Sequence, residues 1–169
     1  MATEYLVPNG NDGGWDVSTH TNIDNGILGG TPDDGAEVNE LTTENAALLL
    51  DLADSAITDA DTVTQVEIRV RARSAGAGND RVGVELFIGG TGQGATNSGS
   101  LTASFVTYVI TNAAWDVDWT AAQLDGAQVQ LTSVQSGMPA TVGHRVSEVE
   151  VDITYTEAPA DTLKPQIWM

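Results

Sequence analysis

Apolar and polar side chains alternate along residues 62–73, which read Thr62-Val63-Thr64-Gln65-Val66-Glu67-Ile68-Arg69-Val70-Arg71-Ala72-Arg73. Successive side chains of a β-strand point to opposite faces of the sheet. One predicted face holds Val66, Ile68, Val70 and Ala72, and the other holds Glu67, Arg69, Arg71 and Arg73. The stretch therefore predicts a strand with one face against an apolar core, and it indicates the fold class more strongly than any other segment.

Further strands are predicted on both sides of this stretch. Alternation of the same kind runs through residues 81–88, 127–132 and 145–155, and residues 104–110 are rich in aromatic and β-branched side chains. The apolar run at residues 46–52 suits a buried strand or one helical turn, and its strand-like neighbours favour a strand.

A single helical turn is predicted between Trp119 and Gly126. Thr120 can cap its start, Gln123 completes a Thr-x-x-Gln capping box, and Gly126 can end it. Many strands with so little helix predict an all-β fold. We expect an antiparallel β-sandwich, jelly-roll-like, with a long N-terminal loop and an extended C-terminal tail.

Turn-forming residues suggest how this one domain is organised. The expected units are an N-terminal strand with a glycine-rich arm (1–35), the β-sandwich (36–156) and a C-terminal tail (157–169). Turn formers are so dense in residues 8–35 that a long loop is expected there, and residues 91–100 also predict a loop. The expected anchors of the first loop are Trp15, Ile23, Ile27 and Leu28.

Charge and composition exclude several classes of protein. The 24 acidic and 6 basic side chains give a net charge of −18, which repels phosphate backbones and argues against nucleic-acid binding. The chain has no cysteine, so neither disulfides nor thiolate chemistry is expected. Neither an export signal nor an apolar stretch of membrane-spanning length is recognisable, so no contact with a membrane is expected.

The residues that usually perform catalysis form no recognisable motif. His20 and His144 are the two histidines, and neither has a serine or a carboxylate at a motif spacing. We therefore expect a protein that is not an enzyme and needs no cofactor. The turns at residues 9–13 and 33–35 hold oxygen ligands that suit calcium, but Asn and Asp also form turns unaided, so no metal site is predicted.

The order of features resembles a group of small structural proteins of tailed bacteriophages. The matching features, spread over residues 15–156, are Trp15, Ile23-Asp24, Asp33-Asp34, the strand Val66–Arg73, the hairpin Leu86–Thr91, the turn Trp119–Leu124 and the closing strand Arg145–Tyr155. The pattern is also similar to carbohydrate-binding β-sandwich modules.

This resemblance implies a structural component of a virion. The expected role is a capsid decoration protein at the particle surface, made in the host cytoplasm, that stabilises the head by contacts with the major capsid protein or another virion protein. A homo-oligomer such as a trimer is expected. The alternative is a carbohydrate-binding or host-adhesion module, in which Trp115 and Trp119 stack on sugars, although burial as core anchors is the favoured role of these rings.

Two groups of contact residues are predicted. Arg69, Arg71 and Arg73 are expected to form a cross-strand ladder of exposed ion pairs with Glu148, Glu150 and Asp152, or else to dock an acidic partner. The tail is apolar at its end, so Leu163, Pro165, Ile167 and Trp168 are expected to dock on a neighbouring subunit or a capsid protein, with folding back onto the sandwich as the alternative.

Overall fold

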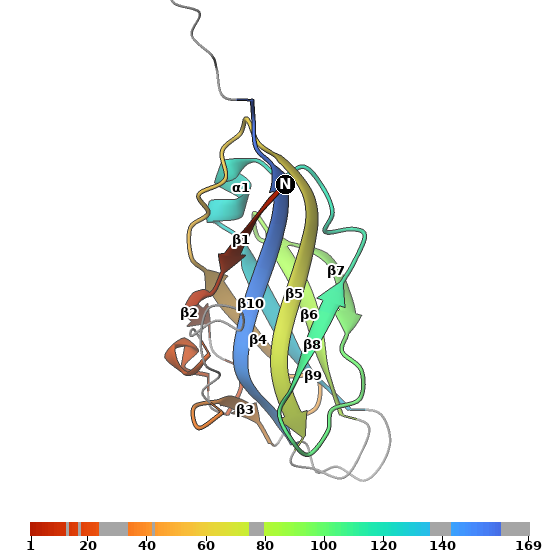
Figure 1. Ribbon diagram of the computed structural model, residues 1–169. Helices are drawn as coiled ribbons and strands as arrows, with labels where there is room; N and C mark the ends of the chain where they lie inside the picture. Colours follow the sequence, from red (N-terminus) through yellow and green to blue (C-terminus); the bar gives the residue numbers. More distant parts are fainter. Residues whose placement is uncertain are drawn as a thin grey trace, which may run out of the picture.

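Two antiparallel sheets face each other in the computed structural model (Figure 1). The structure describes residues 1–12, 14–16, 18–23, 34–41, 43–74, 80–135 and 143–159. Sheet A contains β1 (Ala2–Leu6), β3 (Val38–Glu40), β5 (Thr62–Ser74), β8 (Val106–Thr111) and β10 (His144–Thr156). Sheet B contains β2 (Pro8–Asp12), β4 (Ala47–Leu52), β6 (Arg81–Ile88), β7 (Thr91–Asn97) and β9 (Gln128–Val134).

The order of the strands is β1-β10-β5-β8 in sheet A, with β3 also paired to β10, and β2-β4-β9-β6-β7 in sheet B. Four of the antiparallel pairs are nested, because β6 pairs with β7, β5 with β8, β4 with β9 and β3 with β10. A long hairpin folded over on itself in this way is a jelly roll. The predicted antiparallel, jelly-roll-like β-sandwich is confirmed.

A two-residue turn closes the innermost hairpin of this nest. Ile88 pairs with Thr91, and between them Gly89 and Gly90 have φ angles of 58° and 75°. Two consecutive positive φ angles define a type I′ turn, and glycine adopts them without steric cost.

The strands with regular alternation form where the sequence predicts them. In β5 the side chains of Val66, Ile68, Val70 and Ala72 are at most 1% exposed and face the core. The strands predicted near residues 46–52, 81–88, 104–110, 127–132 and 145–155 are β4, β6, β8, β9 and β10. Between β8 and β9 lies helix α1 (Ala121–Asp125), where the backbone N–H of Thr120 donates to Gln123 Oε1 at 2.9 Å, so the predicted helical turn is also confirmed.

Two edge strands lie where loops were expected. β2 occupies Pro8–Asp12 and pairs with β4, and β7 occupies Thr91–Asn97 and pairs with β6. Both are rich in glycine, proline or asparagine, which have low strand propensity, but a neighbouring strand supplies the hydrogen bonds and edge positions tolerate these residues. The loop predictions were wrong there. Because β1 and β2 belong to the two sheets, the strands of the sandwich begin at Ala2.

The remaining features of the fold are short. A 3-10 helix, η1 (His20–Asn22), lies between β2 and β3. The two ends of the described chain lie side by side in sheet A, where Ala2 pairs with Tyr155. No helix among the described residues is long and apolar enough to span a membrane.

Candidate functional site

The arginines of β5 lie beside the acidic residues of β10, because these two strands are neighbours. Arg71 is opposite Glu148 and Arg69 is opposite Glu150 in the antiparallel register. Arg69 donates through Nε to Asp152, so one ion pair joins the two predicted groups.

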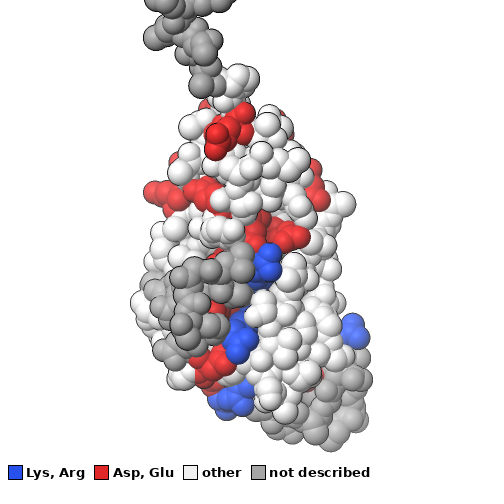
Figure 2. Space-filling view, viewed as in Figure 1, with Lys and Arg blue, Asp and Glu red and all other residues white. Residues whose placement is uncertain are grey.

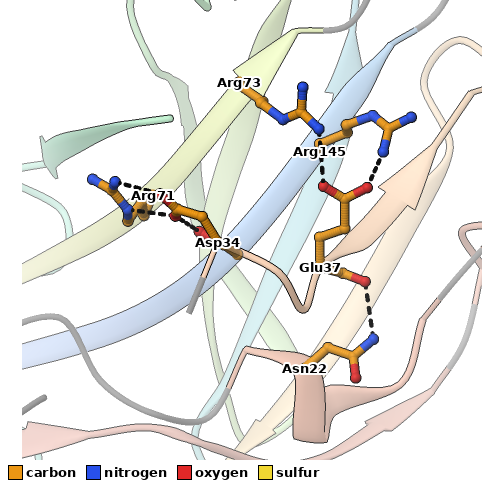
Figure 3. Close-up of polar contacts among 7 residues, drawn as sticks. Asn22, Asp34, Glu37, Arg71, Arg73 and Arg145 are labelled. Atoms are coloured by element: carbon orange, nitrogen blue, oxygen red, sulfur yellow. Dashed lines mark hydrogen bonds and ion pairs between the residues drawn. The ribbon is translucent and has the colours of Figure 1, made fainter. Parts of the chain in front are cut away.

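The other two arginines of β5 also contact carboxylates from another segment of the chain. Arg71 forms a bidentate pair with Asp34, with nitrogen–oxygen distances of 2.8 and 2.7 Å, and Arg73 contacts Glu37 at 3.5 Å (Figure 3). Glu37 also accepts a bond from Arg145. Residues 34–37 therefore add further carboxylates to the predicted ladder over the outer face of sheet A.

The acidic residues of β10 are buried rather than exposed. Glu148, Glu150 and Asp152 are 0%, 1% and 4% exposed, although they lie on the outer face of sheet A. The hydrogen bond that Arg69 donates to Asp152 raises the pKa of Arg69, and the bonds that Arg71 donates to Asp34 raise the pKa of Arg71. Conversely, the bond from Arg71 holds the pKa of Asp34 below its usual value. On this side of the molecule, arginines and carboxylates therefore form a structural ion network.

Trp115 and Trp119 do not form the predicted platform for sugar stacking. Trp115 is 0% exposed and Trp119 is 9% exposed, so neither ring offers a face to a ligand, and this hypothesis is corrected. The indole of Trp115 donates to the carbonyl of Gly94 at 3.0 Å, and that of Trp119 donates to the carbonyl of Trp115 at 2.9 Å. Both rings are core anchors, as is Trp15 at 5% exposure.

The other candidate residues also have structural positions or lie outside the described part. His144 is fully buried, and its Nε2 lies 3.0 Å from the carbonyl oxygen of Val134. Among the described residues, no group of three or more His, Asp or Glu side chains is placed to hold a metal ion. The side chain of His20, the anchors Ile27 and Leu28 and the tail residues Leu163, Pro165, Ile167 and Trp168 lie outside the described residues, so the tail-docking hypothesis stays a prediction.

A hollow of about 430 Å³ lies between the edges of the two sheets. β7 is the last strand of sheet B and β8 is the last strand of sheet A (Figure 1). The residues that line the hollow are Thr96, Asn97, Ser98 and Gly99 on one side and Thr107, Tyr108, Val109, Ile110 and Thr111 on the other.

Hydrogen bonds hold the segments on either side of the hollow. The carbonyl of Gly94 in β7 accepts from Asn112 Nδ2 at 3.1 Å and from the Trp115 indole at 3.0 Å, which ties β7 to the turn after β8. The backbone N–H of Ser98 donates to Val82 at 2.8 Å, and the Tyr108 hydroxyl donates to the carbonyl of Ser100 at 3.1 Å. These hydrogen bonds tie both walls of the hollow to the rest of the fold.

The lining of the hollow is polar but uncharged. Thr96, Asn97, Thr107 and Thr111 make no side-chain hydrogen bond within the described part of the chain, so their hydroxyl and amide groups are available to a ligand. Val109 adds an apolar surface that is 51% exposed. Figure 2 shows that the surface over β8 is almost entirely white, with basic residues along its left border and acidic residues mainly above it. The hollow can hydrogen-bond hydroxyl groups and contact an apolar ring face.

Sequence reasoning missed this site because its two walls come from different sheets. One signal was present in the sequence. Residues 86–115 contain no Asp, Glu, Lys or Arg, although the whole chain has 30 such residues in 169. So long an uncharged segment in so acidic a chain indicates a surface with a separate role.

Comparisons with known proteins give similarity of fold only. No protein-family model and no curated protein matches the sequence. Among solved structures, Xyl-CBM35 in complex with a disaccharide containing glucuronic acid is 17% identical, with 92% of this chain and 98% of that chain covered and a TM-score of 0.47. A family 35 carbohydrate-binding module from an environmental isolate is 13% identical, with the same coverage and a TM-score of 0.49. A family two carbohydrate esterase from Cellvibrio japonicus is 12% identical, with 94% of this chain and 36% of that chain covered and a TM-score of 0.42.

Proposed function

We propose that this protein is a non-enzymatic carbohydrate-binding module and that it binds glycans in the hollow between β7 and β8. One observation supports the proposal above all. Four uncharged polar side chains that make no side-chain hydrogen bond within the described residues, together with an exposed valine, line a hollow whose walls are hydrogen-bonded to the rest of the fold. Its volume of about 430 Å³ is typical of pockets for small ligands.

The chemistry of a sugar matches this lining. A sugar ring presents hydroxyl groups that both donate and accept hydrogen bonds, as do the hydroxyl and amide groups of Thr and Asn. Its C–H faces can pack on the apolar surface of Val109, which lies among the polar groups. A glycan that fills the hollow would leave few buried polar groups without partners, which is the main requirement for binding a polar ligand.

A peptide strand added to the edge of β8 fits the hollow less well. Strand addition obtains its affinity from main-chain hydrogen bonds and its specificity from pockets for alternate side chains. The lining here is mostly Thr, Asn, Ser and Gly, which does not form apolar pockets for such side chains. The predicted role in a virion, with its capsid partner, oligomer and surface location, stays a prediction that no described feature favours.

The proposal is tested with purified protein on a glycan array and with two matched variants. Val109→Asp puts a charge into the hollow, whereas Val106→Asp puts the same charge on the same strand at a residue that is 40% exposed and does not line it. We expect Val109→Asp to weaken glycan binding about tenfold or more, which corresponds to about 1.4 kcal/mol, and Val106→Asp to leave it unchanged. An array without any bound glycan, or equal effects of the two variants, would contradict the proposal.

A further inference from the structure

We infer that the hollow between β7 and β8 selects neutral glycans and rejects glycans that contain uronic acid, sulfate or phosphate groups. This inference rests on the proposed function and specifies its class of ligand. It follows from the charges on and around the hollow, which are independent of the hydrogen-bonding groups that suggest a glycan.

No cation lines the hollow. Its nine lining residues include no Arg, Lys or His, and the uncharged segment 86–115 supplies all of them. A carboxylate or sulfate that contacts this lining gives up part of its hydration without gaining an ion pair. Removing an anion from water without a compensating charge is unfavourable, so the anion binds more weakly than a neutral group of the same shape.

The nearest arginines along the sheet cannot supply that missing charge. Arg69 is opposite Val109 and Arg71 is opposite Thr107 in the pairing of β5 with β8. Each guanidinium is already bonded to a carboxylate, Arg69 to Asp152 and Arg71 to Asp34. An acidic glycan would have to displace a partner that is part of the protein, so these two arginines present little net positive charge to the hollow.

The charge of the whole molecule acts in the same direction. A net charge of −18 gives a negative potential over most of the surface, which lowers the local concentration of anions and slows their association. Figure 2 shows acidic residues above the white surface over β8, while the basic residues on its left border include arginines that are paired with carboxylates. Neutral sugars do not experience this repulsion. The negative electrostatic potential therefore favours a neutral glycan over an anionic glycan of the same shape.

The experiment compares matched polysaccharides that differ only in charge. Mannan, galactan and β-glucan are each offered in the native form and after oxidation of their primary hydroxyl groups to carboxylates, and binding is measured by affinity electrophoresis and calorimetry. We expect at least one native polymer to bind and its oxidised form to bind at least tenfold more weakly at about 0.05 M salt. Binding of the native polymer should change less than about twofold up to about 1 M salt, where charge interactions are screened.

A pair of opposite charges at one position gives a second, independent test. Val109→Lys and Val109→Asp should both weaken binding of the native polymer by about tenfold, because a neutral ligand gains nothing from either charge. Val106→Lys and Val106→Asp are the controls, and thermal melting checks that all four variants fold.

The two proposals fail in different ways. Two results would overturn the selectivity for neutral glycans but leave glycan binding intact. One is an oxidised polymer that binds as tightly as its native form. The other is a Val109→Lys variant that binds the native polymer more tightly than the unmodified protein does. The absence of binding to every polymer would overturn both proposals.

Discussion

Glu37 bridges two arginines that lie directly opposite each other in sheet A. Arg73 and Arg145 are cross-strand partners in the pairing of β5 with β10, and like charges at such positions are destabilising. The carboxylate of Glu37 accepts a bond from each guanidinium (Figure 3). The side chain of Glu37 is 15% exposed and the arginine side chains are 30% and 26% exposed, so solvent screens these bonds only partly.

We expect Glu37→Gln to lower the free energy of unfolding by about 2 kcal/mol. Hydrogen bonds to charged groups contribute about 1.5–3 kcal/mol when buried, and exposed ion pairs contribute about 0.2–1 kcal/mol, so two partly screened bonds lie between these limits. For a protein of this size the loss corresponds to a decrease in Tm of about 4–8 °C. Urea titration followed by tryptophan fluorescence measures the change, because Trp115 is fully buried in the folded state.

The control is Glu44→Gln, since Glu44 is exposed on the loop before β4. We expect this variant to stay within about 0.5 kcal/mol of the unmodified protein. Adding Arg145→Gln to Glu37→Gln should restore part of the lost stability, because it removes one of the two opposed charges. Equal stability of Glu37→Gln and Glu44→Gln, or no recovery in the double variant, would refute this account of the network.

Two further predictions concern acid stability and the wall of the hollow. The pKa of Asp34 is lowered mainly by its bond to Arg71, so the ionised carboxylate stabilises the fold above the unfolded pKa of about 3.9, and this contribution is lost as the pH falls below about 4. Asp34→Asn should therefore lower Tm at pH 7 but not at about pH 2. The exposed control Asp54→Asn should leave Tm unchanged at both pH values. A lower Tm of Asp34→Asn that persists at about pH 2 would contradict this role of Asp34. Gly94 has a φ of 100°, and an added Cβ would lie 3.3 Å from Asn112 Nδ2, so Gly94→Ala should cost about 1–3 kcal/mol in calorimetric melting. Gly99→Ala, with 3.8 Å to Tyr108 and no positive φ, should cost less, and equal losses would argue against strain at Gly94.

The parts of the fold that could be predicted are those in which a single strand contains the signal. Alternation in residues 62–73 and 145–155 identifies two central strands because one face of each must be buried. The edge strands β2 and β7 could not be predicted in this way, since they are held by pairing with β4 and β6 rather than by their own propensity.

The site was harder to predict than the fold. Alternation assigns Glu150 to the outer face of its strand but does not show what covers that face, so its burial was not foreseen. The tryptophans are a similar case, because a ring in a turn can point inward or outward and the sequence pattern is the same. The hollow depends on two strands of different sheets coming together, which no pattern along one strand can reveal, and the long uncharged segment was its only trace in the sequence.

The nested pairing of the strands has a consequence for the rate and order of folding. The hairpin of β6 and β7 closes across two glycines. Once this hairpin has formed, the loop that β5 and β8 must close is effectively shorter. The same holds in turn for the pair β4 and β9 and for the pair β3 and β10. The entropy cost of closing a loop grows with its length. We therefore expect the strand pairs to form in order from the turn at Gly89-Gly90 outward, and the whole chain to fold in about milliseconds to seconds. Substitutions in that turn should then slow refolding in stopped-flow experiments, whereas substitutions in β3 should mainly speed unfolding.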